Sequence, residues 1–209
     1  MELVRCEQHT CTSYEGMLES PFEPTAEIYR AIQVGGQKNA PGKEGLGREF
    51  YSHNWTIIND DLCEVINQMF CAGNIAATKK RCDSLPAESA KESNIRRPSP
   101  LTLLNSDYKI VARIIAQRLR PVLPDHLKET QFCGVPGNTI IDALATVRDT
   151  IAFAESRRIR LWVLSLDFKN SFGRIAHNHL FQTLQGYGIG NAFIAGMKRI
   201  MKLLRLQFK

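Results

Sequence analysis

Residues 161–168 have the sequence LWVLSLDF, and this stretch decides the architecture that we expect. The run 161–166 is apolar on both faces, a pattern typical of a strand buried in the middle of a sheet. Asp167 follows at the C-terminal end of the expected strand, where ligand sites tend to lie in α/β folds. A carboxylate on a rigid element suits a hard cation such as Mg²⁺. The alternative is an aspartate that only caps the turn after the strand.

Helices are expected on both sides of this strand, because apolar residues recur there at helical spacing. Residues 78–100 are instead polar, contain three prolines, and are predicted to form a loop or to be disordered. The expected helices are a short one opening at Pro24-Thr25 with Ile28, Ala31 and Ile32 on one face, one capped by Asn59 and reaching Phe70, one capped by Ser106 and ending near Pro121, one over about 139–156, one holding Leu180 to Leu184, and one starting near Asn191.

The bulk properties describe a basic globular chain without membrane segments. The net charge of +6 is uneven, since residues 1–95 hold 9 Lys/Arg and 14 Asp/Glu, whereas residues 96–209 hold 18 and 7. Such an excess suits a polyphosphate partner, and the alternative is a solvated basic surface. The sequence shows no signal peptide and no apolar run long enough to span a bilayer, so we expect an intracellular protein of the cytoplasm or nucleus. The six cysteines lack the spacing of a structural zinc site.

Longer blocks of the sequence resemble one known family. In order, they are APGKEGLGREFY (40–51), NDDLCEVINQMF (59–70), RPSPLTLLNSDYKIVARIIAQRLRPVLP (97–124), QFCGVPGNTIIDALATVRDTIAFAE (131–155) and LSLDFKNSFGRI (164–175). The series resembles the reverse transcriptase domain of LINE-type (non-LTR) retrotransposons. The resemblance covers about residues 24–206 and is most specific between Leu101 and Ile175.

The resemblance implies RNA-directed DNA polymerase activity, in which a primer 3′-hydroxyl attacks a dNTP beside two metal ions. Asp167 matches the metal-binding carboxylate of the first palm motif, and the main-chain carbonyl of Phe168 would be a second ligand. The implied ion is Mg²⁺, with Mn²⁺ as the alternative. Phe172 matches the side chain under the sugar that selects dNTP, and Arg97 matches the arginine that reaches the triphosphate. Without the resemblance, Phe172 is a core residue and Arg97 a surface residue.

The resemblance also implies contacts with an RNA template and a DNA primer. A turn of the form Gln-x-x-Gly-x-Pro-Gly lies near the template in the family, and its counterpart here consists of Gln131, Gly134, Pro136 and Gly137. Arg118, Arg120 and Arg148 are candidates for contacts with backbone phosphates. An exposed helical face is an equally good interpretation of Arg148.

Several positions depart from the family pattern. Gly173 stands where the family has Asp, and Asn138 replaces a usual Arg. Residues 82–90 occupy the place of an apolar strand, and the fingers lysine is missing. The Asp-Asp hairpin and the thumb would lie beyond Lys209. We therefore expect a catalytically incomplete reverse transcriptase fragment that binds its metal weakly. The alternatives are a non-catalytic RNA- or DNA-binding remnant and a non-functional pseudogene product.

The expected fold class is α+β, a partial right-hand polymerase that contains the fingers and the start of the palm, helix-rich with an incomplete sheet. The expected segments are a loosely ordered lead-in (1–22), an N-terminal extension with the helices before the fingers (23–75), a polar loop with degenerate fingers (76–100) and the fingers and palm portion (101–209).

Overall fold

The structure is a computed structural model, and it describes residues 15–22, 24–34, 40–42, 44–72, 83–85, 101–168 and 174–205. The chain divides into two compact units. The first unit contains Gly16–Gln117 and Asn191–Lys209, and the second contains Arg118–Gly190. The first unit therefore joins two segments that lie at opposite ends of the sequence.

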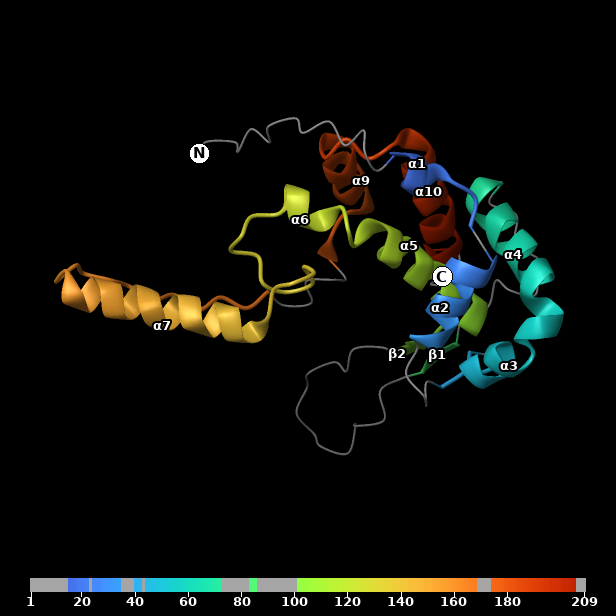
Figure 1. Cartoon of the computed structure of the whole chain (residues 1–209), viewed down its shortest axis with the longest axis horizontal. Helices are drawn as coiled ribbons and strands as arrows, with labels where there is room; N and C mark the ends of the chain where they lie inside the picture. The colour runs from blue at the N-terminus through green and yellow to red at the C-terminus, as the bar shows by residue number, and fades with distance from the viewer. Residues whose placement is uncertain are drawn as a thin grey trace. The chain divides into compact units, whose positions relative to one another are not determined.

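The first unit is mainly helical (Figure 1). Two short strands pair antiparallel beside the helices, with Asp83 opposite Leu103 and Leu85 opposite Leu101. Its elements are α1 (Glu15–Glu19), the π-helix η1 (Pro24–Ile28), α2 (Tyr29–Gln33), α3 (Arg48–His53), α4 (Trp55–Cys71), β1 (Asp83–Leu85), β2 (Leu101–Leu103), α5 (Ser106–Leu119, whose last two residues belong to the second unit) and α10 (Asn191–Arg205).

The core of the first unit lies where α4, α5 and α10 meet η1 and α2. The Phe70 ring of α4 is in contact with Phe22 at 5.0 Å between centroids and with Phe193 of α10 at 5.7 Å. The hydroxyl of Tyr108 on α5 donates a hydrogen bond to the carbonyl of Ile200 on α10. The fully buried side chains here are Leu18, Ile28, Ile32, Ile66, Met69, Ile110, Val111, Ile114, Phe193 and Ile194.

The second unit contains α6 (Leu123–His126), α7 (Ile140–Ser156) and α9 (His177–Gly186). Helix α7 begins with a capping box, in which the Thr139 hydroxyl accepts from the Asp142 N–H and the Asp142 carboxylate accepts from the Thr139 N–H. Such reciprocal bonds satisfy two N–H groups that a helix start otherwise leaves open. The His126 ring stacks on Tyr187, just after α9, at 4.8 Å.

The predicted helices are confirmed, with differences at two helix starts. Ser106 is the first residue of α5 and not its cap, and its hydroxyl donates to the Leu46 carbonyl. Helix α4 begins at Trp55 and not after Asn59, whose side-chain amide donates to the Thr56 carbonyl inside the helix. The Trp55 ring packs on Tyr29 at 5.3 Å and so anchors a first turn that precedes the predicted cap. Asn costs a helix interior well under 1 kcal/mol, which is too little to end a helix that has this contact.

The prediction of a buried strand over residues 161–166 is wrong. These residues belong to no helix or strand, and their apolar side chains are exposed, with Trp162 at 91% and Leu164 at 78%. A strand that is apolar on both faces needs paired neighbours and a covering layer on each side. Within the described residues the one sheet consists of β1 and β2, which pair with each other and offer 161–166 no partner.

The prediction of a loop over 78–100 is wrong for Asp83–Leu85, which form β1. The partner strand β2 supplies the hydrogen bonds, so the pairing forms without the apolar alternation that we looked for in the sequence. The other residues of 78–100 lie outside the described part of the chain. No helix in the described part is long and apolar enough to cross a membrane.

Candidate functional site

Asp167 lies on an exposed segment of the second unit. Residues 159–168 have no regular secondary structure, and the side chain of Phe168 is 78% exposed. Asp167 is therefore exposed on a segment without regular secondary structure, and Phe168 follows it in the chain. Arg97 and Phe172, the other residues predicted to surround the dNTP, lie outside the described residues, so their distances to Asp167 stay predictions.

The oxygen ligands at this segment fit one divalent ion only in part. Mg²⁺ is usually held by one or two carboxylates together with substrate phosphates. Asp167 and the Phe168 carbonyl provide two hard oxygen donors of that kind. Among the described residues no group of three His, Cys, Asp or Glu side chains could enclose a metal ion. This donor set suits an ion that arrives with its phosphate ligands, and it does not form a metal site by itself.

The turn at residues 131–138 is braced by its own side chains. The Gln131 amide donates to the Cys133 carbonyl at 2.9 Å, and the Asn138 amide donates to the Gln131 carbonyl at 2.7 Å. Gly134 and Gly137 have φ values of 78° and 90°, a left-handed conformation that glycine adopts without strain. Asn138, where the family usually has Arg, thus closes the turn with a hydrogen bond and contributes no charge.

A cavity lies between this turn and the start of α7. Its volume is about 420 Å³, which is in the range of small-molecule sites. Pro136 stands between the two glycines and is partly buried. Apolar side chains therefore line a cavity beside a polar turn that hydrogen bonds hold together. Its lining residues are Gln131, Phe132, Cys133, Ile140 and Ala143.

The three arginines predicted to contact phosphates differ in their surroundings. Arg118 is only 4% exposed and Arg120 is exposed. Arg148 Nε donates to Asp149 Oδ1 at 2.8 Å on the surface of α7. The hydrogen bond from Arg148 lowers the pKa of Asp149, so this pair keeps both charges. Arg120 is therefore the arginine of this set whose exposed side chain has no carboxylate partner among the described residues.

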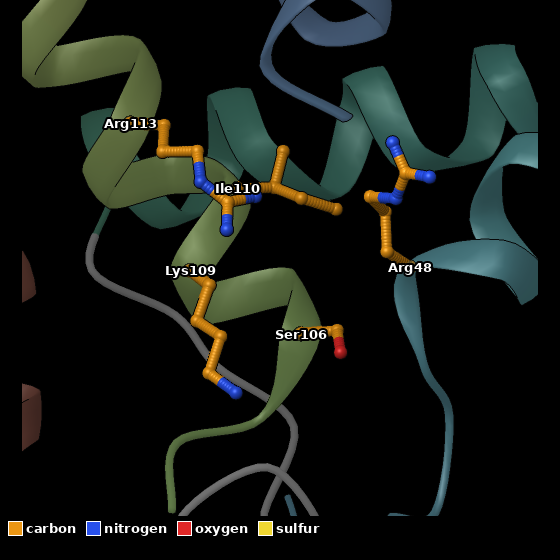
Figure 2. A pocket seen from close by; sticks show the side chains of 5 residues that line it. All are labelled: Arg48, Ser106, Lys109, Ile110 and Arg113. Atoms are coloured by element: carbon orange, nitrogen blue, oxygen red, sulfur yellow. The ribbon is translucent and has the colours of Figure 1, made fainter. Parts of the chain in front are cut away.

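The sequence analysis missed a second group of cations, which lies in the first unit. Arg48, Lys109 and Arg113 line one narrow pocket between α3 and α5 (Figure 2). The spacing of Lys109 and Arg113, four residues apart on one helix, was a usable signal, because such residues share a helical face. Nothing in the sequence placed Arg48 beside them.

Comparisons with known proteins concern the family of the chain and not its individual site residues. The family model described as "Reverse transcriptase (RNA-dependent DNA polymerase)" matches residues 90–207. The chain is 34% identical over 182 residues to the Transposon TX1 uncharacterized 149 kDa protein of Xenopus laevis, and the match covers 87% of this chain and 14% of that protein. It is 26% identical over 176 residues to the Retrovirus-related Pol polyprotein from type-1 retrotransposable element R2 of Popillia japonica, with 80% and 23% covered. The chain thus spans a small part of each relative.

Proposed function

The chain belongs to the reverse transcriptase (RNA-dependent DNA polymerase) family, and we propose that it supplies the fingers and the start of the palm of such a polymerase. The two relatives, both proteins of non-LTR elements, confirm the LINE-type origin that the sequence predicts. Members of this family bind template and primer and generally use divalent metal ions. The part that this chain plays in the reaction depends on its own residues.

The braced turn at 131–138 is the observation that carries the proposal. A template strand needs a surface that is rigid before it binds, because ordering a loop on binding costs affinity. The hydrogen bonds of Gln131 and Asn138 supply that rigidity. The apolar cavity beside the turn offers space for the face of a base, and Arg120 offers charge for the backbone. Gln131, Gly134, Pro136 and Gly137 are the proposed template contacts.

Asp167 is the proposed metal-binding carboxylate of the polymerase reaction. Its exposure lets a dNTP and its ion approach, and the Phe168 carbonyl lies next to it in the chain. A bound Mg²⁺ would offset negative charge on the phosphoryl group that is transferred. Arg97 is proposed to contact the triphosphate, and Phe172 to lie under the sugar and exclude a 2′-hydroxyl. A guanidinium suits the triphosphate because it contacts phosphate oxygens in pairs.

The 209-residue chain is proposed to bind nucleic acid without extending a primer. Two divalent ions that lie close together repel each other, and several carboxylates are needed to hold both. Within the described residues Asp167 belongs to no such cluster. The basic half of the chain, with 18 Lys/Arg in residues 96–209, supports binding that does not depend on this site.

The test combines a binding assay and a primer-extension assay on the 209-residue chain. We expect fluorescence anisotropy to show an RNA template annealed to a DNA primer binding at low salt, with an affinity that falls steeply as salt rises. We expect no extension with Mg²⁺ or Mn²⁺. Absence of binding at low salt would contradict the proposed function and favour a non-functional product. Incorporation of a dNTP that disappears in Asp167→Ala would contradict the proposed lack of chemistry.

A further inference from the structure

Three basic side chains line a narrow pocket of the first unit, which we call the basic notch. Figure 2 shows Arg48 on α3 and Lys109 and Arg113 on α5, with Ile110 between the two helices. Ser106, the first residue of α5, completes the lining. We propose that the basic notch holds one backbone phosphate of the bound nucleic acid strand. This inference rests on the proposed function and adds a contact that the sequence did not indicate.

Main-chain carbonyls hold all three cations in place. Arg113 Nη1 donates to the Ala31 carbonyl at 3.3 Å, and Arg48 Nη1 donates to the Gln33 carbonyl at 3.0 Å. Both carbonyls belong to α2. Lys109 Nζ donates to the Ala40 carbonyl at 2.8 Å. The cations are therefore ordered before any ligand arrives, which reduces the entropy that binding would otherwise cost.

Among the described residues, these bonds leave most of the N–H donors of the three side chains without an acceptor. A guanidinium has five N–H donors and an ammonium has three, and each of these side chains donates one hydrogen bond to a main-chain carbonyl in the structure. The Nε of Arg48 is buried and has no partner within the described residues. A buried N–H is normally satisfied by an acceptor, so this group indicates that an acceptor is missing. A phosphate oxygen is an acceptor of the right charge.

The nearby carboxylates do not occupy the basic notch. Glu44 accepts a hydrogen bond from the Ser106 N–H, and the buried Asp107 accepts one from the Tyr108 N–H. Both carboxylates add to the effect of burial in raising the pKa of Tyr51. Their charge reduces the positive potential of the notch, and each accepts a hydrogen bond from a main-chain N–H at the start of α5. The notch thus keeps a surplus of one positive charge over these two carboxylates.

The size of the basic notch selects among phosphate ligands. Its volume is about 10 Å³, which is room for one atom of the size of water. A nucleotide does not fit, and neither does a triphosphate. A non-bridging oxygen of a phosphodiester fits, because the rest of the strand stays outside. The chemistry that matches is therefore the backbone of a nucleic acid strand lying across α3 and α5.

The test measures how the affinity of the 209-residue chain for a single-stranded RNA depends on salt. The variants are Arg48→Gln, Lys109→Gln, Arg113→Gln and the triple variant, and the control is Lys202→Gln, an exposed lysine of α10. We expect each single variant to weaken binding by roughly threefold to tenfold. Each phosphate of a single strand that the protein contacts contributes about 0.7 to the magnitude of the slope of log affinity against log salt. The slope measured for the triple variant should therefore be smaller in magnitude by about 0.7 if the three cations share one phosphate, and by about 2 if they contact three phosphates.

Several results would overturn the basic notch while leaving the proposed function intact. One is a triple variant whose affinity depends on salt with the same slope as the wild type. Another is a triple variant whose slope is smaller in magnitude by about 2. The variants should lose the same affinity for a DNA strand of the same sequence, because the notch contacts a phosphate and no sugar hydroxyl. Variants that lose affinity for inorganic phosphate but keep their affinity for both strands would also contradict the proposal. If the triple variant lacks the helical circular dichroism of the wild type, the affinity of Lys109→Gln decides: a loss no larger than that of Lys202→Gln would contradict the proposal. Wild-type protein that binds neither strand would instead contradict the proposed function.

Discussion

The ring of Phe70 lies directly against the backbone of Gly196, so that a Cβ added to Gly196 would come within 2.4 Å of the ring atoms Cε2 and Cζ. The ring cannot turn away freely, because Phe22 and Phe193 contact it at 5.0 and 5.7 Å between centroids. Helices α4 and α10 therefore approach each other at a position where only glycine fits. This contact fixes the C-terminal helix onto the first unit.

Gly196→Ala should destabilise the chain although alanine favours helices. Alanine gains up to about 1 kcal/mol over glycine in a helix interior, whereas overpacking costs about 1–3 kcal/mol. We expect the free energy of unfolding, measured by urea titration, to fall by about 1 kcal/mol. Gly186→Ala is the control, since a Cβ there meets nothing within 4 Å and should not destabilise. Equal effects of the two substitutions would show that Phe70 does not restrict α10. The loss at Gly196 should shrink in a Phe70→Leu background.

The sequence predicted the helices well because each carries its own signals. The helical spacing of Ile110 and Ile114 is local, and it needs no knowledge of the remaining chain. The strand at 161–166 failed for the opposite reason. A strand depends on partners from elsewhere, and its apolar run cannot show whether those partners are present. The pairing of β1 with β2 was missed because three-residue strands carry almost no pattern.

The candidate site was predictable only where a motif is contiguous. The turn at Gln131 to Gly137 was indicated by the resemblance, and its two glycines take the left-handed positions. The role of Asn138 in closing that turn did not follow, because an amide that replaces a charged residue looks like a loss. The basic notch was not predictable either. Arg48 is separated from Lys109 by all of α4 and by both strands, and only folding brings them together.

The apolar stripe of α7 should contribute little to the stability of the chain. Ile140, Leu144 and Val147 lie on one side of the helix and are at least half exposed, with Leu144 at 64%. Leu144→Gln should change the free energy of unfolding by less than about 0.5 kcal/mol, as surface substitutions usually do. Ile114→Ala, at a fully buried position of α5, should cost about 2–5 kcal/mol in the same urea titration. A loss above about 1 kcal/mol for Leu144→Gln would show that the stripe is covered.

The start of α7 should loosen in acid. The Thr139 hydroxyl and N–H donate to the Asp142 carboxylate at 2.7 and 2.8 Å, and they lower the pKa of Asp142 from its ordinary 3.8. Because the folded pKa is the lower one, this stabilisation is fully present above pH 3.8 and disappears as the pH falls through the folded value. In an NMR titration, the amides of 140–143 should move toward disordered shifts over that range.

The matched variants for this titration are on the same helix. Thr139→Val removes the hydroxyl that contributes most to lowering the pKa of Asp142, so the carboxylate should titrate closer to 3.8. Thr150→Val removes a hydroxyl that donates to the Thr146 carbonyl and should leave the titration of Asp142 unchanged. An Asp142 carboxylate that titrates alike in the wild type and in Thr139→Val would argue against the capping box.

Asp167→Asn should remove metal binding and leave stability unchanged, and this combination separates a ligand role from a structural one. An aspartate that only capped a turn would lower the free energy of unfolding when replaced, by about 1 kcal/mol in the manner of helix caps. An exposed aspartate that serves as a ligand should change it by less than about 0.5 kcal/mol. Millimolar Mn²⁺ should broaden the amide signals of 166–168 in the wild type and much less in Asp167→Asn. Asp149→Asn, which removes an exposed carboxylate paired with Arg148, should keep the broadening at 166–168. Broadening that persists in Asp167→Asn would place the ion elsewhere, because one carboxylate with a neighbouring carbonyl is the whole donor set that this segment offers.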